Sequence, residues 1–353
     1  MKVALHVGQL RQPVPGGAGT YVRSLLRSLP AAGVTLSTFG SGPADPTWPE
    51  FVDLGHPKPP LRYALWHRVR RPRVAPAVDV VHAPTLAVPP TGRVPLVVTA
   101  HDVAFLRFPD AFTPHGVRFH RRGLALARRH AAAVIAPSAF TCAELIAEGF
   151  EPTRVFVAHH GAPAVPPRSD DEVDAIIAAL GLPTPFVLTV GTIEPRKGLR
   201  SLFSAFAELR LRGITLVVAG PRGWGEVSVP PDVVELGAVD PHTLDALYRR
   251  ASAFALASRY EGFGMPALEA MAYGVPVVAS NVASLPEVVG QAGLLVPPGD
   301  EDAWADAIAS VVTDEERGMR LGYAGRERAA EFTWERSATA HLEAYEAAAS
   351  TAP

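Results

Sequence analysis

The feature that most constrains the fold is a repeated pattern. A short apolar run rich in β-branched residues is followed by a turn and a longer amphipathic stretch. Strands that are apolar on both faces and alternate with helices are typical of parallel sheets covered by helices on both sides. No run approaches the roughly 20 apolar residues that a membrane span needs. Strands are therefore expected at residues 2–8, 79–84, 96–102, 133–138, 155–161, 186–192, 215–220, 233–239, 253–258 and 276–281.

The expected strands form two groups, separated by a segment rich in proline and charge, APAVPPRSDDEV at residues 162–173. Such a composition is typical of a linker, and 353 residues are enough for about two domains. We predict an α/β protein with two doubly wound, Rossmann-like domains facing an interdomain cleft, where ligands would bind at the carboxyl ends of the strands. The predicted boundaries are 1–163 for the first domain, 164–180 for the linker, 181–332 for the second domain, and 333–353 for a C-terminal helix packing back toward the first domain.

Charge is distributed unevenly along the chain. Residues 1–165 hold 18 Lys and Arg against 9 Asp and Glu, whereas the remainder holds 15 against 26. Basic clusters interleaved with aromatic and aliphatic residues lie at 62–74 and 115–130. They are either solvated helix faces or contacts for anionic lipid headgroups or a phosphorylated acceptor. No nucleic-acid-binding motif accompanies the charge, so no nucleic acid is expected as a partner.

The cysteine content and the N-terminal residues indicate the cellular compartment in which the protein is expected. The single cysteine, Cys142, excludes an intrachain disulfide framework and argues against a metal cage, which suits a reducing cytosol. The N-terminal stretch MKVALHVGQL has a short apolar run without the apolar core and cleavage site of a signal peptide, and it is expected to be the first strand. A cytoplasmic protein is therefore expected.

A candidate anion site lies in the second half of the chain, where the run FVLTVGT continues into IEPRKGL and a helical stretch. Arg196 and Lys197 are thus expected on a strand-to-helix loop, beside Gly198 and near a helix N-terminus, where free N–H groups and the helix dipole favour an anion. Lysine is otherwise present only as Lys2 and Lys58. Charge-assisted hydrogen bonds from these two side chains would suit a diphosphate. Alternatively, both are exposed surface cations.

Two carboxylates bracket a glycine-rich stretch in RYEGFGMPALEAMAYGVPVVASN. Glu261 is expected on the loop after a strand, and Glu269 in the first turns of a helix opened by Pro266. Gly262 and Gly264 would let backbone amides approach a ligand closely. The alternative is that Glu269 only complements the helix dipole and that Glu261 is a solvated loop acid.

The first half of the chain offers two further features. Gly16, Gly17 and Gly19 are expected between the first strand and a helix, but their spacing does not fit the dinucleotide-binding fingerprint. His101 and Asp102 end the run LVVTAHD, where they are expected to point toward the cleft. Other histidines lie at or near strand ends as well, so some of these must be bystanders: His6, His82, His159 and His160.

With these residues assembled, the chain resembles the retaining glycosyltransferases of family 4, also called group 1, which have the GT-B fold of two Rossmann-like domains. The resemblance covers nearly the whole chain, and its most specific element is EGFGMPALE, the E-x7-E motif, followed by AMAYGVPVVAS. GTIEPRKGL is similar to the phosphate-binding loop of the family. THDVAFLRFPDAF and VIAPSAFTCAEL resemble the acceptor domain of its bacterial mannosyltransferase-like branch.

The resemblance implies roles for individual residues of the second domain, which would bind the nucleotide-sugar. Glu261 would contact hydroxyls of the donor sugar, and Glu269 the ribose. Arg196 and Lys197 would neutralise the diphosphate and the charge that develops on the leaving group. Backbone contacts to the sugar and phosphates would come from Gly262, Phe263 and Gly264, and the base would be lined by Val239 and Leu244.

In the first domain, which would bind the acceptor, Gly17 would approach the phosphates, and His101 would lie near the reacting carbon and the outer hydroxyls of the sugar. Gly16, Gly19 and Asp102 would lie on the acceptor side. Many family members place an arginine directly after the glycine of the phosphate loop, where this chain has Thr192. Arg196 is expected to supply that charge in this T-x-E-P-R-K variant of the loop.

The resemblance implies transfer of a hexose from a nucleotide-sugar to an acceptor hydroxyl with retention of anomeric configuration. In a front-face mechanism the departing phosphate deprotonates the acceptor, so no second carboxylate is required. No cofactor or metal ion is expected, because the D-x-D pair of Asp300 and Asp302 is better explained as a helix cap and first turn. GDP-mannose is favoured as donor, with a UDP-sugar left open.

The acceptor is expected to be a glycan or a lipid-linked molecule, with the basic first domain touching the inner face of the plasma membrane. Three other functions stay open at this point. A nucleotide-sugar epimerase would use the same donor without an acceptor. A nicotinamide-dependent dehydrogenase is favoured only by the α/β pattern. An inactive nucleotide-binding homologue would keep the fold without the reaction.

Overall fold

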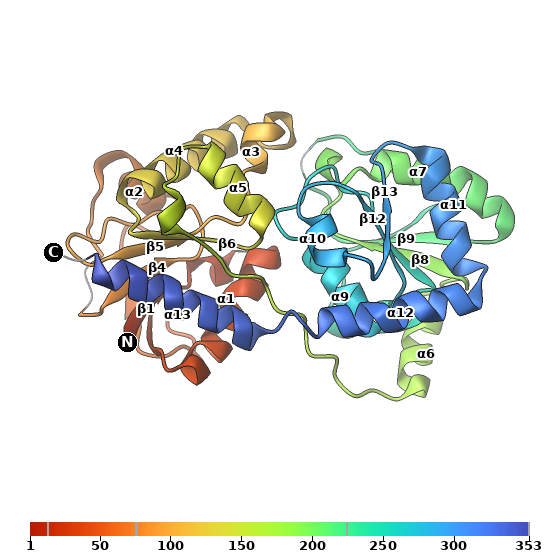
Figure 1. The fold of residues 1–353 in the computed structure, drawn as a ribbon, viewed down its shortest axis with the longest axis horizontal. Coiled ribbons are helices and arrows are strands. Elements are labelled where there is room, and N and C mark those ends of the chain that lie inside the picture. The colour runs from red at the N-terminus through yellow and green to blue at the C-terminus, as the bar shows by residue number, and fades with distance from the viewer. Residues whose placement is uncertain (13, 75–76, 224, 352–353) are drawn as a thin grey trace. The chain divides into compact units, whose positions relative to one another are not determined.

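A computed structural model describes residues 1–12, 14–74, 77–223 and 225–351. The chain divides into two compact units. Unit 1 comprises Met1–Arg107, Pro114–Gly161 and Thr333–Pro353, and unit 2 comprises Phe108–Thr113 and Ala162–Phe332. Each unit is built around one parallel sheet with helices on both of its faces (Figure 1).

In unit 1, the described residues form a seven-stranded sheet with the order β3-β2-β1-β4-β5-β6-β7. Every pairing is parallel, and the order reverses direction between β1 and β4, which is the arrangement of a doubly wound sheet. The strands are β1 (Lys2–His6), β2 (Thr35–Gly40), β3 (Phe51–Asp53), β4 (Val80–Ala83), β5 (Leu96–Thr99), β6 (Ala133–Ala136) and β7 (Val155–Val157). The helices are α1 (Gly16–Ser28), α2 (Leu61–Val69), α3 (Ala104–Arg107), α4 (Pro114–His130), α5 (Ala139–Ala147) and α13 (Trp334–Ser350).

In unit 2, the described residues form a six-stranded parallel sheet with the order β10-β9-β8-β11-β12-β13, again doubly wound. The strands are β8 (Phe186–Val190), β9 (Thr215–Ala219), β10 (Val234–Gly237), β11 (Ala253–Leu256), β12 (Val277–Ser280) and β13 (Leu294–Val296). The helices are α6 (Asp170–Ala179), α7 (Leu199–Leu209), α8 (Pro241–Arg250), α9 (Met265–Tyr273), α10 (Leu285–Val289), α11 (Glu301–Val312) and α12 (Glu315–Ala329).

The central strands explain why apolar runs specify these sheets. β4, β6, β11 and β12 are buried along their whole length, because helices cover both faces. Each large apolar side chain removed from water in this way contributes about 1.5–3 kcal/mol. All ten predicted strands are confirmed, although most end before the predicted residue, and Asp300 caps α11 as predicted by accepting a hydrogen bond from the Ala303 N–H. β2, β3 and β13 were not predicted.

Two predicted boundaries are affected by the structure, that of the linker and that of the C-terminal helix. Residues 164–180, expected as a linker, include helix α6, whose N-terminus is closed by a capping box between Ser169 and Glu172. Arg250 of α8 forms ion pairs with Asp170 (2.8 Å) and Asp174 (2.6 Å), so α6 packs on unit 2. Residues 352 and 353, at the end of the expected C-terminal helix, lie outside the described residues.

Helix α13 joins unit 1 through a chain of buried hydrogen bonds. His341 donates from Nδ1 to the Ser337 carbonyl (2.6 Å), so its Nε2 accepts from the Tyr21 hydroxyl (2.5 Å). The Tyr21 oxygen then accepts from Thr99 (2.7 Å). The Thr99 oxygen in turn accepts a hydrogen bond from the His82 Nε2–H (2.8 Å). His82 Nδ1 accepts one from the Tyr345 hydroxyl (2.8 Å).

This order of donors applies when both imidazole rings are neutral, and their pKa values are lowered accordingly. Burial, with smaller effects of neighbouring histidines, lowers the pKa of His82 well below its ordinary value. Burial also lowers the pKa of His341 to about 4. The buried hydroxyls and ring nitrogens are thereby paired, which removes the penalty that an unpaired buried polar group would carry. The hydrogen-bonded residues come from two distant parts of the sequence. Tyr21, His82 and Thr99 lie on or beside α1, β4 and β5 near the start of the chain, whereas His341 and Tyr345 lie on α13 near its end.

Candidate active site

Arg196 and Lys197 lie in the loop after β8, in a single 3-10 turn (Pro195–Lys197) that leads into α7. Gly198 caps α7 in the left-handed conformation, with φ of 64°. A Cβ there would lie 1.9 Å from the carbonyl oxygen of Ala257, so glycine is needed for the turn to rest against the end of β11. The two cations thus both lie on the strand-to-helix loop at the carboxyl end of β8, beside Gly198, as the sequence predicted.

Lys197 and Glu261 form the central ion pair of the site. The Lys197 Nζ lies 2.6 Å from Glu261 Oε1, and the two side chains are only 12% and 10% exposed. Arg196 Nη1 lies 3.5 Å from the other oxygen of Glu261. The interpretation of these three residues as solvated surface charges is therefore wrong, because they are half-buried or buried and paired with one another.

Further contacts fix this cluster in place. The Ser258 hydroxyl donates to Glu261 Oε1 (2.6 Å), and the Ser284 hydroxyl donates to the Glu261 carbonyl (2.9 Å). Arg196 donates from Nη2 to Glu194 Oε1 (2.6 Å) and from Nη1 to the Tyr260 carbonyl (2.9 Å). Two cations thus face two carboxylates, and both loops that carry them are tied together by side-chain to backbone hydrogen bonds.

The electrostatics keep Glu261 ionised. Burial raises the pKa of its carboxyl, but the Lys197 ammonium, the Arg196 guanidinium and the hydrogen bonds from Lys197 and Ser258 outweigh burial and lower it to about 2. A carboxylate that is charged, buried and held by three side chains is a fixed acceptor of hydrogen bonds. It can orient hydroxyl groups of a ligand without taking or giving a proton near neutral pH.

Glu269 lies on α9 in a different environment. Its Oε2 accepts a hydrogen bond from the Tyr248 hydroxyl of α8 (2.9 Å). Burial raises the pKa of Glu269 to about 7, against the smaller opposing effect of that hydrogen bond. The two glutamates of the E-x7-E segment therefore differ, since the pKa of Glu261 lies far below neutral pH and that of Glu269 lies close to it.

The glycine-rich stretch between the glutamates bends tightly into α9. Gly264 is the cap of α9 with φ of 99°, and a Cβ there would lie 2.6 Å from Leu285. The Phe263 side chain is 4% exposed and belongs to the hydrophobic core, so its backbone is the part that a ligand could reach. Val239 and Leu244, the expected lining of the base, are half-buried and pack against the same core.

The glycines of the first unit are placed differently from the prediction. Gly16, Gly17 and Gly19 do not form a loop before the helix but begin α1 itself. Gly16 and Gly17 are exposed in its first turn, whereas Gly19 is buried and donates from its N–H to the Pro15 carbonyl (3.0 Å). The expected position of these glycines between the strand and the helix is therefore wrong, because the helix already begins at Gly16, whose φ of 59° is one that glycine adopts readily.

His101 and Asp102 follow the end of β5 after one residue, Ala100, and are half-buried. The His101 Nε2–H donates to the Pro84 carbonyl (2.9 Å), which leaves Nδ1 as the unprotonated nitrogen. Burial lowers the pKa of His101, while the Pro84 hydrogen bond and the charge of Asp102 act in the opposite direction. Asp102 Oδ1 accepts from the Ala104 N–H (2.9 Å) at the start of α3.

Several residues of the cluster were missed by sequence reasoning. Glu194 and Ser258 stand within the stretches that were singled out, and each is a polar residue just after a strand, which is a usable signal. Ser284 and Tyr248 had no such signal. They reach Glu261 and Glu269 from separate helical segments, and only tertiary packing brings them there.

Within the described ranges, no group of three or more His, Cys, Asp or Glu side chains is placed to hold a metal ion. Likewise, none of the described helices is both long and apolar enough to cross a bilayer.

Comparison with known proteins identifies the class of this chain. Residues 15–164 match the model of glycosyltransferase family 4, and residues 172–328 match the model of glycosyl transferases group 1. The chain is 35% identical over 266 residues to an O-antigen chain mannosyltransferase B of Escherichia coli, covering 70% of this chain and 69% of that protein. It is 34% identical over 282 residues to a D-inositol 3-phosphate glycosyltransferase of Nocardia farcinica, covering 72% of this chain and 62% of that protein.

Solved structures share the fold over almost the whole chain. A sucrose-phosphate synthase from Thermosynechococcus elongatus has a TM-score of 0.71 at 22% identity and covers 98% of both chains. HepE from Anabaena, solved in complex with UDP and glucose, has a TM-score of 0.74 at 20% identity and covers 97% of this chain and 98% of its own. The predicted GT-B fold is thus confirmed.

The chain belongs to the group 1 glycosyltransferases of family 4. It is a retaining enzyme of that family, which transfers a sugar from a nucleotide-sugar donor. Membership in this family decides against the epimerase and the nicotinamide-dependent dehydrogenase that sequence reasoning had left open.

Proposed function

We propose that this glycosyltransferase transfers mannose from GDP-mannose to a hydroxyl group of a glycan or lipid-linked acceptor. The support for mannose is the 35% identity to a relative named as an O-antigen chain mannosyltransferase. A UDP-sugar is the second candidate donor, because the same fold binds UDP and glucose in the Anabaena structure. The two donors differ in the base, which Val239 and Leu244 would line.

The observation that carries the assignment of the donor site is the buried pair of Lys197 and Glu261, 2.6 Å apart. In the absence of donor, Glu261 compensates the charge of Lys197. A diphosphate would bring at least two negative charges beside Lys197 and Arg196, and the ammonium has further N–H donors to offer it. Glu261 then keeps its own charge and accepts hydrogen bonds from the sugar hydroxyls.

In the proposed reaction, the bond between the anomeric carbon and the phosphate oxygen breaks while the acceptor oxygen bonds to the same face of that carbon. The proton of the acceptor hydroxyl passes to the departing phosphate, so no carboxylate is needed as a base. Lys197 and Arg196 stabilise the negative charge that develops on the leaving diphosphate, which is the main demand of the step.

The remaining roles follow from position and electrostatics. Glu269 accepts hydrogen bonds from the ribose, Gly262 and Gly264 offer backbone N–H groups, and Gly17 approaches the phosphates from the exposed first turn of α1. His101, neutral and held by the Pro84 carbonyl, presents its unprotonated Nδ1 near the outer hydroxyls of the sugar. Gly16, Gly19 and Asp102 belong to the acceptor side.

Calorimetric titration with GDP, UDP and ADP tests the donor site. We expect one nucleotide to bind best and its affinity to fall by more than tenfold in Lys197→Ala, because a charge-assisted hydrogen bond contributes about 1.5–3 kcal/mol. Lys58→Ala, which removes an exposed lysine, is the matched control and should bind normally. If no nucleotide bound the wild-type chain, the inactive-homologue reading would replace this proposal.

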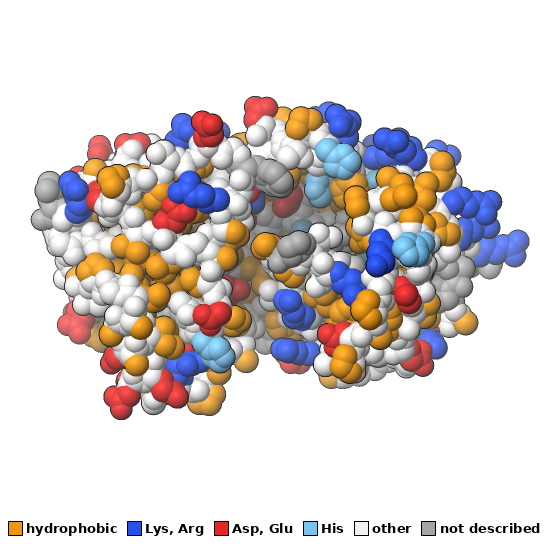
Figure 2. Space-filling model, turned by 180° about the vertical axis from the view of Figure 1, so that it is seen from behind, with side chains coloured by type: hydrophobic (Ala, Val, Ile, Leu, Met, Phe, Trp, Pro, Cys, Tyr) orange, Lys and Arg blue, Asp and Glu red, His pale blue; other side chains and the backbone are white. Residues whose placement is uncertain are grey.

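Contact with a membrane is the second part of the proposal. Lys and Arg side chains gather on unit 1, as Figure 2 shows on the face drawn. Arg62, which belongs to the first basic cluster, cannot contact a membrane because it is only 1% exposed. Its guanidinium group instead donates to the carbonyls of Leu54 (2.7 Å) and Gly55 (2.9 Å). The exposed arginines of α4 remain, including Arg118 and Arg121.

We propose that these arginines rest on anionic lipid at the cytoplasmic face of the plasma membrane. Sedimentation with phosphatidylglycerol vesicles at low salt tests this contact, which should weaken as salt is added. Failure to bind such vesicles at low salt would refute membrane contact and leave the donor-site proposal untouched.

A further inference from the structure

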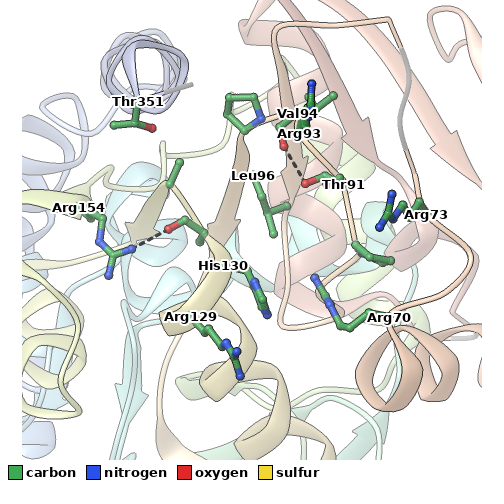
Figure 3. A pocket seen from close by; sticks show the side chains of 15 residues that line it. Arg70, Arg73, Thr91, Arg93, Val94, Leu96, Arg129, His130, Arg154 and Thr351 are labelled. Carbon is green, nitrogen blue, oxygen red and sulfur yellow. Dashed lines mark hydrogen bonds between the residues drawn. The ribbon is translucent and has the colours of Figure 1, made fainter. Parts of the chain in front are cut away.

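A cavity of about 480 Å³ opens in unit 1 and is lined by an unusual number of cations. Arg70, Arg73, Arg93, Arg129 and Arg154 each contribute a guanidinium group to its wall, His130 adds an imidazole, and none of its described lining residues is Asp or Glu. Figure 3 shows Arg154 on one side, Arg70 and Arg73 on the other, and His130 between them. Its size is within the range of ligand pockets, about 300–1,000 Å³.

The cavity lies at the opposite edge of the sheet from the candidate active-site residues of this unit. Leu96, which lines it, is the first residue of β5, and Ala132 and Arg154 directly precede β6 and β7. His101 and Asp102 instead follow the carboxyl end of β5. Because substrates of doubly wound sheets bind at the carboxyl ends of strands, this cavity is separate from the site of sugar transfer.

Two of the arginines are anchored by the backbone. Arg70 donates to the carbonyls of Val88 (2.8 Å) and Pro89 (3.0 Å), and Arg154 donates to the carbonyl of Ala131 (3.1 Å). These bonds fix both guanidinium groups in the wall and leave them charged. Arg70 even adopts a left-handed backbone conformation, with φ of 54°, at the end of α2. Such backbone strain is tolerated only where surrounding contacts hold it.

The other cations reach the cavity from the surface. Arg73, Arg93 and Arg129 are exposed and come from three separate segments: the loop after α2, the turn before β5, and the end of α4. Arg129 also complements the carboxyl end of the α4 dipole. That explanation does not extend to Arg73 or Arg93, which are on no helix.

We propose that this cavity binds a phosphate-bearing ligand, a phosphate or diphosphate ester, at a site distinct from the donor site. Guanidinium groups match the oxygens of a phosphate with paired hydrogen bonds, and several such groups converging without a carboxylate favour an anion with more than one charge. The proposal does not depend on the identity of the sugar donor.

The titration of His130 agrees with a positive field inside the cavity. Burial is the main cause that lowers the pKa of His130, and the charges of Arg70 and Arg129 lower it further. An anion bound among these groups would offset the two arginine charges and raise the pKa of His130 again.

The test uses inorganic pyrophosphate and the full chain carrying Lys197→Ala, so that the donor site does not contribute. Calorimetric titration at constant ionic strength should show binding at one site. Adding Arg93→Gln and Arg129→Gln together should weaken that binding by about tenfold per arginine removed. The side chains of Arg93 and Arg129 are exposed, so we expect the double variant to fold. Its midpoint of thermal unfolding, compared with that of the parent chain, checks this expectation.

The matched control carries Arg27→Gln and Arg68→Gln instead. It removes the same charge from α1 and α2, at exposed positions that do not line the cavity. Binding should be retained in this control. Absence of pyrophosphate binding, or an equal loss in the control and the cavity variant, would overturn the proposal by leaving only diffuse attraction to a basic surface.

The source of the phosphate group is decided by a second arm with vesicles of phosphatidylglycerol and phosphatidylcholine. Vesicle binding that is lost in the Arg93→Gln, Arg129→Gln variant and displaced by pyrophosphate would assign the cavity to a lipid headgroup. Vesicle binding unchanged by that variant, together with pyrophosphate binding that depends on it, would assign the cavity to a soluble phosphate ester.

Discussion

The contact between Tyr248 and Glu269 makes a quantitative prediction about nucleotide binding. The Tyr248 hydroxyl donates to Glu269 Oε2 (2.9 Å), and burial holds the pKa of Glu269 at about 7. If the carboxylate accepts hydrogen bonds from the ribose, only the ionised form binds well. Nucleotide affinity should then fall about tenfold for each pH unit below 7.

Tyr248→Phe removes the one interaction that lowers the pKa of Glu269. A hydrogen bond to a charged group contributes about 1.5–3 kcal/mol, and about 1.4 kcal/mol corresponds to one pKa unit, so the pKa should rise by about 1–2 units. At pH 7 the variant should bind nucleotide roughly 5- to 50-fold more weakly than the wild type. The two should converge near pH 9.5, where Glu269 is ionised in both.

The assay is calorimetric titration with the preferred nucleotide between pH 6.5 and 9.5. Tyr273→Phe is the matched control, since it removes the hydroxyl of the neighbouring stacked ring, which donates to Asp245 (2.7 Å) rather than to Glu269. Glu269→Gln should bind weakly with no dependence on pH in this range. A Tyr248→Phe profile that superimposed on the wild type, or a loss that persisted at pH 9.5, would refute the reasoning.

Further predictions concern stability, turnover and backbone geometry. Glu261 has its pKa lowered to about 2 from an ordinary 4.5, so its pairing stabilises the fold fully above about pH 4.5 and is lost as pH falls toward 2, on the order of 3 kcal/mol. Urea unfolding at pH 7 and pH 3 should show about 2 kcal/mol of that loss in the wild type, because pH 3 is still above the folded pKa, and a much smaller pH dependence in Lys197→Met would confirm the cause. His101→Ala should reduce turnover while the nucleotide still binds with wild-type affinity, and normal turnover would remove His101 from the site. Gly264→Ala should destabilise unit 2 measurably in thermal unfolding, because φ of 99° and the 2.6 Å approach to Leu285 leave no room for a Cβ, whereas Gly299→Ala, with φ of 83° and open space around it, provides a control for strain alone.

The strands that could be predicted are those that consist of apolar residues because they are buried. β4, β6 and β12 are continuous apolar runs because both faces of the sheet are covered. β2 carries Ser37 and Thr38 in buried positions, so its sequence TLSTFG reads as polar although it pairs with β1 along its whole length. β3 and β13 are three-residue edge strands, as is β7, but β7 is the apolar run VFV, whereas β3 (FVD) ends in an exposed aspartate and neither β3 nor β13 was singled out from its sequence.

The candidate site shows the same division between local and tertiary information. Arg196, Lys197 and Glu261 could be predicted because each follows a strand at its carboxyl end, where parallel sheets bring side chains together. The Tyr248 contact could not, because nothing in the sequence of α8 specifies which side chain of α9 it meets. The glycines at the start of α1 were misplaced because glycine disfavours helices in general, and tertiary contacts overrode that preference.

The return of α13 to unit 1 has a consequence for the order in which the chain can fold. As a polypeptide emerges from the ribosome, domains generally fold from the N-terminus onward. Here Tyr21 and His82 are synthesised early. Their hydrogen-bond partners, His341 and Tyr345, are synthesised only after the whole of unit 2. Unit 2, almost all of which is one continuous stretch, is therefore the first to have its full set of residues. Unit 1, which begins the chain, is therefore the last to be completed. Until α13 has packed onto it, its unfinished core remains accessible to chaperones and proteases.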